Sequence, residues 1–186
     1  MTERRAVAMI SIDPGTTHSG WVSLDGNGYV VRAGVMANEA LLGQLGQSLE
    51  ERQQTLAIEW VSSFGMPVGR EVFETCRWVG RFQEAWHTPC DVVLITRAEV
   101  KRVLCNSARA KDPNVRQALI DLYPPTGGGS VPQIGTAKRR GPLYGVSSHA
   151  WSALAVAVVA SGRFAKADGR AVPAFMGATP LERITA

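Results

Sequence analysis

Apolar residues recur along this chain with two different periods, and together they predict a mixture of strands and helices. Short apolar runs bounded by Gly, Pro, Asn or Asp are typical of strands, and they span 6–12, 20–24, 29–35, 55–60 and 91–95. Apolar residues spaced by three or four positions predict helices over 38–54, 68–86, 96–104, 112–123 and 146–160. We therefore expect an α/β fold in which helices flank a partly antiparallel sheet.

Two segments have unusual patterns. The helix predicted over 68–86 carries two apolar stripes, and two apolar faces imply two packing partners. One stripe runs through Val72, Cys76 and Val79, and the other through Trp78, Phe82 and Trp86. The segment 124–145 is rich in glycine and proline, so we expect a long surface loop there.

The overall composition says little about function, but the positions of the charged residues along the chain are more informative. A length of 186 residues with 45% hydrophobic content suits one domain, which we place at 1–162, followed by a tail at 163–186 with little periodicity. The net charge of +4 is modest. However, basic residues gather between the fifth predicted strand and the last helix, where they predict either a phosphate-tracking rim or a solvated face. They include Lys101, Lys111, Arg116, Lys138, Arg139 and Arg140.

The cysteines and the longest apolar run bear on the compartment. Cys76, Cys90 and Cys105 show no paired spacing, which favours reduced thiols in a cytoplasm over a disulfide or a zinc site. The run over 150–160 is too short to cross a bilayer, and no signal-peptide pattern opens the chain. We therefore expect an intracellular protein without a membrane partner.

Candidate chemistry begins with two acids at strand ends. Asp13 closes the first apolar run and is followed by a Pro-Gly turn, and Glu59 lies at the far end of the run over 55–60. An acid at a strand end beside a glycine turn is an arrangement that holds a hard cation. If the two runs are neighbouring strands, Asp13 and Glu59 point at one shared metal site.

The last predicted helix is apolar nearly all round and should be buried against the sheet. His149 and Ser152 are its polar exceptions, and a spacing of three places them on one face. That face can point at the two carboxylates. We therefore expect His149 to converge with Asp13 and Glu59.

These residues carry a resemblance that covers about 6–160. The chain resembles the RuvC-type Holliday-junction resolvases, in a bacteriophage or prophage branch, within the ribonuclease-H-like superfamily. The matching motifs are Ile12-Asp13-Pro14-Gly15 with Gly20, Glu59 at the fourth strand end, Val100-Lys101 with the basic 108–115 segment, and His149 to Ala157. One position departs from the family pattern, because Ser152 stands where the closing helix usually supplies an aspartate.

The resemblance implies a ribonuclease-H-like fold, with a five-stranded mixed sheet, and metal-assisted hydrolysis of a phosphodiester in branched DNA. Two Mg²⁺ ions about 4 Å apart, or Mn²⁺ in their place, would be held by Asp13, Glu59 and His149. Asp13 would bridge the ions and Glu59 would orient the attacking water. His149 could ligate, position a water or pass a proton, and the sequence does not choose among these roles.

The resemblance also implies contacts with DNA and with a second copy of the chain. Trp78, Phe82 and Trp86 would form a homodimer interface, because two symmetric cuts resolve a four-way junction. Phe64 would either stack on an unpaired base or cap the core. The basic residues Lys101, Lys111, Arg116 and Lys138 to Arg140 would contact phosphates. If the chain is phage-encoded, the compartment is the bacterial host's cytoplasm.

Three other functions are compatible with parts of this sequence. With Ser152 in place of an acid, the chain could bind branched DNA with weak or lost nuclease activity. An actin-like ATPase shares the Asp-Pro-Gly strand end but needs a second lobe, for which this chain is too short. A ribosomal-RNA-processing nuclease of the YqgF type fits the fold, and the extra basic segments favour DNA over it.

Overall fold

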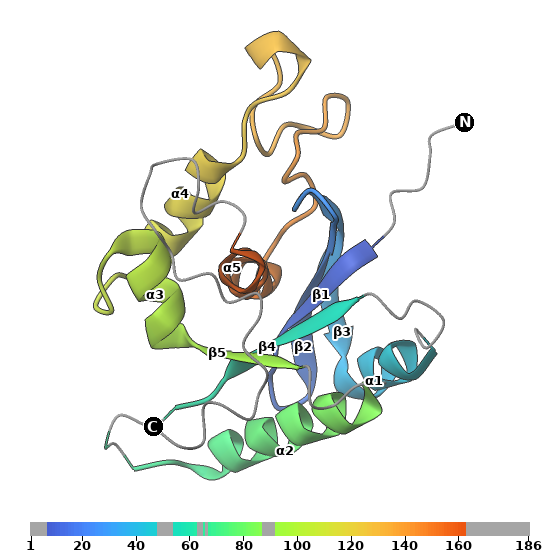
Figure 1. The fold of residues 1–186 in the computed structure, drawn as a ribbon, viewed down its shortest axis with the longest axis vertical. Helices are drawn as coiled ribbons and strands as arrows, with labels where there is room; N and C mark the ends of the chain where they lie inside the picture. The colour runs from blue at the N-terminus through green and yellow to red at the C-terminus, as the bar shows by residue number, and fades with distance from the viewer. Residues whose placement is uncertain (1–6, 48–53, 63–64, 66, 87–91, 163–186) are drawn as a thin grey trace.

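A five-stranded mixed sheet with helices on both faces forms the body of the molecule (Figure 1). The computed structural model describes residues 7–47, 54–62, 65, 67–86 and 92–162. Its strands are β1 (Val7–Asp13), β2 (His18–Asp25), β3 (Val30–Ala37), β4 (Thr55–Trp60) and β5 (Val93–Thr96). They lie in the order β3-β2-β1-β4-β5, with β1 to β3 antiparallel and β1, β4 and β5 parallel. The predicted fold class is therefore confirmed.

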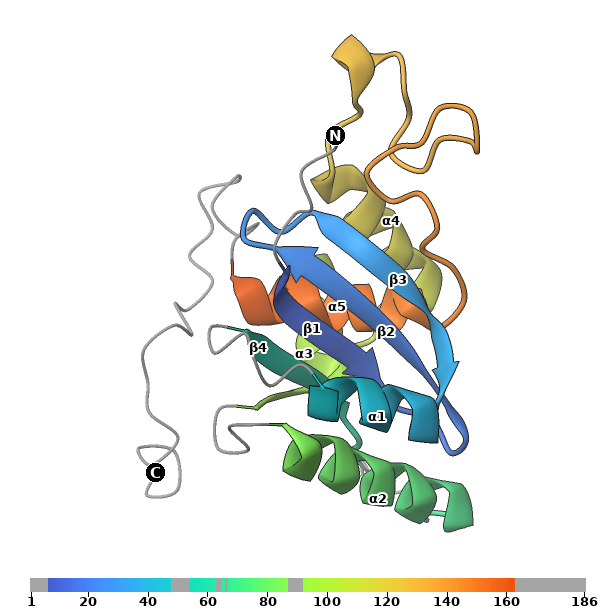
Figure 2. The ribbon, with the colours of Figure 1, turned by 90° about the vertical axis from the view of Figure 1, so that its right-hand side faces the viewer.

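The helices form one layer on each face of this sheet, as Figure 2 shows from the side. They are α1 (Asn38–Gln47), α2 (Arg70–Ala85), α3 (Arg97–Cys105), α4 (Asp112–Leu122) and α5 (Ala150–Ser161). α1 and α2 cover one face, and α5 covers the other with α3 and α4 beside it. The helix predicted over 38–54 is described as far as Gln47, and 48–53 lie outside the described residues.

The alternation of side chains along the strands divides the core into two clusters, and it also decides from which face of the sheet Asp13 and Glu59 project. Ile12 and Ile58 pack toward α1 and α2, while Met9 and Ala57 pack toward α5. Successive side chains of a strand point to opposite faces. Asp13 is two residues from Ser11 and four from Met9, and Glu59 is two from Ala57, so both acids project toward α5.

α5 is shorter at its start than the sequence predicted. The expected helix spans 146–160, but α5 begins at Ala150 because the preceding residues form turns. Ser148 adopts a left-handed backbone with φ 45°, and the Ala150 N–H donates to the Ser147 carbonyl instead of a helical partner. His149 is therefore the N-cap residue of α5, one turn before Ser152.

α2 has one core face, and this corrects the predicted dimer surface. Phe82 and Trp86 are 0% and 1% exposed and pack with Val79 against α1 and the sheet. They cannot contact a second copy, so the prediction is wrong for these two residues. Trp78 is only partly buried, with the Arg81 guanidinium 4.2 Å from its ring centroid, and its role at an interface stays a prediction.

The segment after α4 is the predicted surface loop, and it projects beyond the sheet (Figure 1). A short 3₁₀ turn at Gly127–Gly129 and isolated bridges joining Thr126 to Val131 and Gly135 to Arg140 give it local structure. Leu143 is fully buried and anchors its return to α5. Among the described residues, no helix is long and apolar enough to cross a bilayer.

Candidate active site

Asp13 and Glu59 lie side by side at the carboxyl ends of two parallel strands. The register pairs Ile12 with Ile58, and the next position on each strand is the acid. Each carboxylate side chain is only 16% exposed, because α5 covers this face of the sheet. The two acids therefore form a semi-buried pair at one edge, as the sequence predicted.

The turn that follows Asp13 is held by a buried polar network. The Asn38 side-chain amide donates to the Gly15 carbonyl at 2.9 Å, and the Ser19 hydroxyl donates to the Asn38 side-chain oxygen at 2.7 Å. The Asn38 backbone N–H donates to the Thr17 carbonyl. Because Asn38 is 1% exposed and satisfied on each of these groups, the turn has one well-defined conformation.

The start of α5 brings two further polar groups to Asp13. His149 Nδ1 lies 3.2 Å from Asp13 Oδ2, and the imidazole is 69% exposed. Ser152 lies near the same carboxylate and lowers its pKa slightly. This approach requires Gly20, which pairs with Asp13 on β2, because a Cβ there would collide with the His149 backbone. The structure therefore places His149 beside Asp13, and Asp13 beside Glu59.

Burial raises the pKa values of both acids, and the charge of Asp13 adds to the shift of Glu59. Burial raises the pKa of Asp13, and His149, Arg97 and Ser152 oppose this shift. Burial, followed by the charge of Asp13, raises the pKa of Glu59 to about 7, although Arg97 and Lys101 oppose this shift. A pair of desolvated carboxylates is costly unless a positive charge compensates it. The site therefore favours a bound cation.

Arg97 supplies part of that positive charge, and the sequence reasoning missed it. Arg97 is the first residue of α3, directly after β5, and its guanidinium lies 3.4 Å from Glu59 and 2.8 Å from Asp112. Lys101 lies 3.5 Å from the same Asp112 carboxylate. The sequence does contain one indication of this role: Arg97 directly follows β5, and β5 ends at the same edge of the sheet as β1 and β4.

Asp112 has a different role from the one predicted. Asp112 is the first residue of the helix predicted over 112–123, and an acid before a proline there is a typical N-cap. In the structure, Lys111 occupies the N-cap position and its N–H donates to the Asn114 side chain at 3.0 Å. Asp112 instead pairs with Arg97, which holds its pKa below the usual range. Lys101 is thus an ion-paired residue at the site rather than an isolated surface cation.

The donor set fits a divalent cation only in part. Carboxylate oxygens are the preferred ligands of Mg²⁺, and Asp13 and Glu59 provide them from adjacent strand ends. Within the part of the chain that the structure describes, no group of three or more His, Cys, Asp or Glu residues is placed to hold a metal. Two acids with water therefore fit one ion better than the expected pair, for which Ser152 offers only a hydroxyl.

The predicted DNA contacts are distributed around this centre. Arg116 lies on α4 beside α5, Lys111 is exposed just before α4, and Lys138, Arg139 and Arg140 are exposed on the projecting loop. Arg140 stacks on Tyr144, 4.9 Å from the ring centroid. Phe64 lies outside the described residues.

Comparison with known proteins gives a fold and no sequence relative. No protein-family model and no curated protein matches this sequence. Thermus thermophilus RuvC in complex with a Holliday-junction substrate superimposes with a TM-score of 0.57 and 16% identity, over 82% of this chain and 92% of that one. A second Thermus thermophilus RuvC structure gives a TM-score of 0.53 and 18% identity, over 84% and 93%. The chain has the RuvC-like fold.

Proposed function

We propose that this protein is a divalent-cation-dependent endonuclease that cleaves branched DNA, with four-way junctions as its favoured substrate. The observation that supports this most strongly is the semi-buried pair of Asp13 and Glu59 beneath His149. The RuvC-like fold supports the choice of substrate, because one of the similar structures is a RuvC bound to a Holliday junction. The proposal extends to a role in recombination or phage DNA processing.

The chemistry is hydrolysis of a phosphodiester. A water oxygen attacks phosphorus, the bond from phosphorus to the 3′ oxygen breaks, and the products carry a 5′ phosphate and a 3′ hydroxyl. A bound Mg²⁺ or Mn²⁺ lowers the pKa of water and stabilises charge on phosphate oxygens. Asp13 and Glu59 would hold this cation, and Glu59 would orient the attacking water. His149, exposed on the solvent side of Asp13, would ligate the cation, position a water or carry a proton to the leaving oxygen.

The basic residues around the site would hold the DNA backbone. Lys111, Arg116 and the Lys138 to Arg140 cluster are exposed, and contacts of this kind fix orientation without reading sequence. Two cuts placed symmetrically across a junction call for a homodimer. With Phe82 and Trp86 in the core, we propose that α2 makes this contact through Phe73, which is 63% exposed, and through the partly exposed Trp78.

A second candidate is a structure-specific DNA-binding protein with weak or lost cleavage. It is favoured by the hydroxyl at Ser152 and by the guanidinium of Arg97, which already contacts Glu59. In that case the cation site would bind metal poorly and the basic surface would remain. The two candidates differ only in turnover.

The deciding experiment uses a synthetic four-way junction, a flap and a plain duplex, each incubated with the wild-type chain in Mg²⁺ and in Mn²⁺. The proposal expects symmetric cuts near the branch point, loss of cutting in Glu59→Gln and Asp13→Asn, and retained binding in both variants. Binding without any cutting by the wild type in either metal would favour the second candidate and overturn the first.

A further inference from the structure

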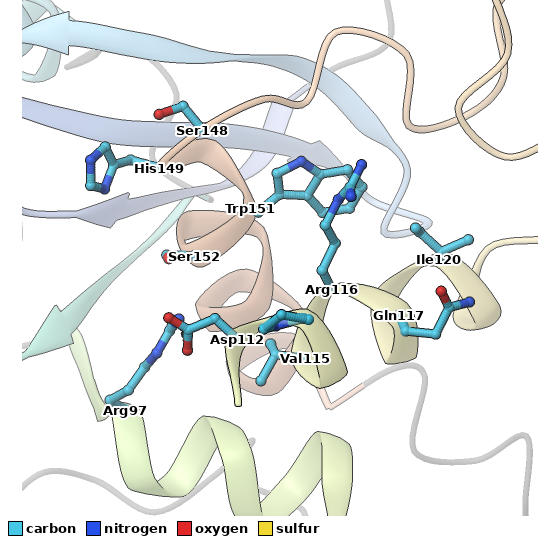
Figure 3. A pocket seen from close by; sticks show the side chains of 11 residues that line it. Arg97, Asp112, Val115, Arg116, Gln117, Ile120, Ser148, His149, Trp151 and Ser152 are labelled. Carbon is cyan, nitrogen blue, oxygen red and sulfur yellow. Dashed lines mark ion pairs between the residues drawn. The ribbon is translucent and has the colours of Figure 1, made fainter. Parts of the chain in front are cut away.

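A pocket of about 500 Å³ opens directly beside the proposed catalytic residues, between α4 and the start of α5 (Figure 3). His149 and Ser152 line one end of it, together with Arg97. Arg116 and Trp151 line the other end, away from His149. The volume lies within the range of about 300–1,000 Å³ that is typical of small-molecule sites.

Arg116 is prepared to bind an anion in this pocket. Its guanidinium lies 4.9 Å from the centroid of the Trp151 ring, which is a cation–π contact that fixes the orientation of the planar group. In the described part of the chain no carboxylate forms an ion pair with it, because Asp112, one turn earlier, is taken by Arg97 and Lys101. A guanidinium that is oriented but not neutralised matches the bidentate geometry of phosphate.

The rest of the lining suits the base of a nucleotide. Ile120, Val115 and Trp151 form an apolar wall, and Gln117 and Ser148 add polar groups at its margins. Ser148 has a left-handed backbone, φ 45°, which is uncommon for a residue with a side chain and recurs at binding sites. An apolar wall beside a fixed cation is the complement of a base joined to a phosphate.

We propose that this pocket holds one extrahelical nucleotide of the cleaved strand, next to the bond that is cut. Arg116 binds its phosphate, and Trp151 with Ile120 packs against its base. This inference rests on the proposed nuclease function and adds a positioning site to it. A nucleotide held here would place the neighbouring phosphodiester at Asp13 and Glu59, because His149 and Ser152 border both the pocket and that pair.

The test uses junctions that carry 2-aminopurine, one position at a time, in the three nucleotides on either side of the branch point in each strand. Binding is measured with the wild-type chain in Ca²⁺. We expect the fluorescence of one position to change on binding. For this position, the affinity measured from the fluorescence change should fall about 5- to 100-fold in Arg116→Ala and in Trp151→Ala. Trp151→Phe should keep most of the signal. Arg32→Ala, which removes an exposed arginine from β3, is the charge control and should leave the signal unchanged.

The possible outcomes separate the two proposals. A position-specific signal that depends on Arg116 supports the pocket, even if the wild type never cuts in Mg²⁺ or Mn²⁺, in which case only the nuclease proposal fails. Cutting by the wild type with no position that depends on Arg116 or Trp151 overturns the pocket and leaves the nuclease intact. Trp151 packs partly against the core, so Trp151→Ala could lose the signal simply by unfolding. Its result is therefore compared with those of Arg116→Ala and Trp151→Phe, and unfolding curves of all three variants serve as controls.

Discussion

Arg97 Nη1 lies 3.4 Å from Glu59 Oε2. The arginine therefore already compensates part of the negative charge that a bound metal ion would neutralise. The same guanidinium reaches Asp112 at 2.8 Å and is thereby held in place. Arg97 offsets part of the repulsion between Asp13 and Glu59, but it also opposes the entry of a second positive charge. The contact therefore links the stability of the metal-free site to its affinity for cations.

Replacing Arg97 with glutamine should tighten cation binding. The substitution removes a positive charge next to Glu59 and frees Asp112, so we expect Mn²⁺ affinity to rise roughly fivefold, or about 1 kcal/mol. Titration with Mn²⁺ by calorimetry, at a pH about two units above the Glu59 pKa of about 7, avoids competition from protons. Arg102→Gln, an exposed position on the same helix, is the control. Unchanged or weaker binding in Arg97→Gln would contradict the electrostatic role.

Stability without metal should fall as pH rises from about 4.5 to about 7. The pKa of Glu59 is raised in the folded chain, first by burial and then by Asp13, from 4.5 to about 7. In this window the folded state binds the extra proton, so the free energy of unfolding decreases with pH and levels off above about 7. The whole loss amounts to at most about 3 kcal/mol for a shift of this size.

Urea unfolding in EDTA at several pH values measures this slope. Glu59→Gln should flatten it and should be more stable than the wild type at high pH, because its amide carries no charge to desolvate. Mg²⁺ should reverse the trend in the wild type, since the cation competes with the proton on Glu59, and its stabilising effect should grow with pH. A wild-type slope identical to that of Glu59→Gln would show that the carboxylate titrates normally.

The positions of the two acids could be predicted from the sequence, because neighbouring parallel strands end at the same edge of a sheet. Asp13 and Glu59 each close an apolar run, so their convergence needed only the correct strand order. Arg97 follows the next parallel strand and obeys the same logic, but a long charged side chain can point in several directions. Its contacts with Glu59 and Asp112 depend on how α3 packs against α4, which the local pattern does not contain.

The misassigned residues of α2 have a related explanation. Helical spacing alone placed Trp78, Phe82 and Trp86 on one stripe, and it could not say which stripe meets the sheet. In the structure the core takes Val79, Phe82 and Trp86, while the Trp78 ring packs partly under Arg81. The start of α5 was also misplaced, because the left-handed backbone of Ser148 has no signature in a run of apolar residues.

Gly20→Ala should damage the site more than it damages the fold. The added methyl group would collide with the carbonyl group of His149, so the start of α5 must move away from Asp13. Overpacking of this kind costs roughly 1–3 kcal/mol of folding free energy. We expect a measurable loss of thermal stability and a larger, at least tenfold, loss of cleavage. Gly43→Ala is the matched control, because nothing lies near the added methyl on α1. Normal cleavage by Gly20→Ala would show that His149 need not stay close to Asp13.

Ser152→Asp should strengthen cation binding at the expense of the metal-free protein. Ser152 lies close enough to Asp13 to lower its pKa, so an aspartate there would place a third carboxylate beside Asp13 and Glu59. Without metal the added charge increases repulsion in a semi-buried site, and the melting temperature in EDTA should fall. With Mn²⁺ the third oxygen ligand should lower the concentration needed for half-maximal cleavage by about tenfold, which is about 1.4 kcal/mol. Ser152→Asn, which has a similar shape and no charge, separates geometry from electrostatics. If Ser152→Asp folds normally with Mn²⁺ present but gains no affinity for Mn²⁺, the cation does not bind on the α5 side of the Asp13–Glu59 pair. The role of His149 beside that cation would then have to be abandoned.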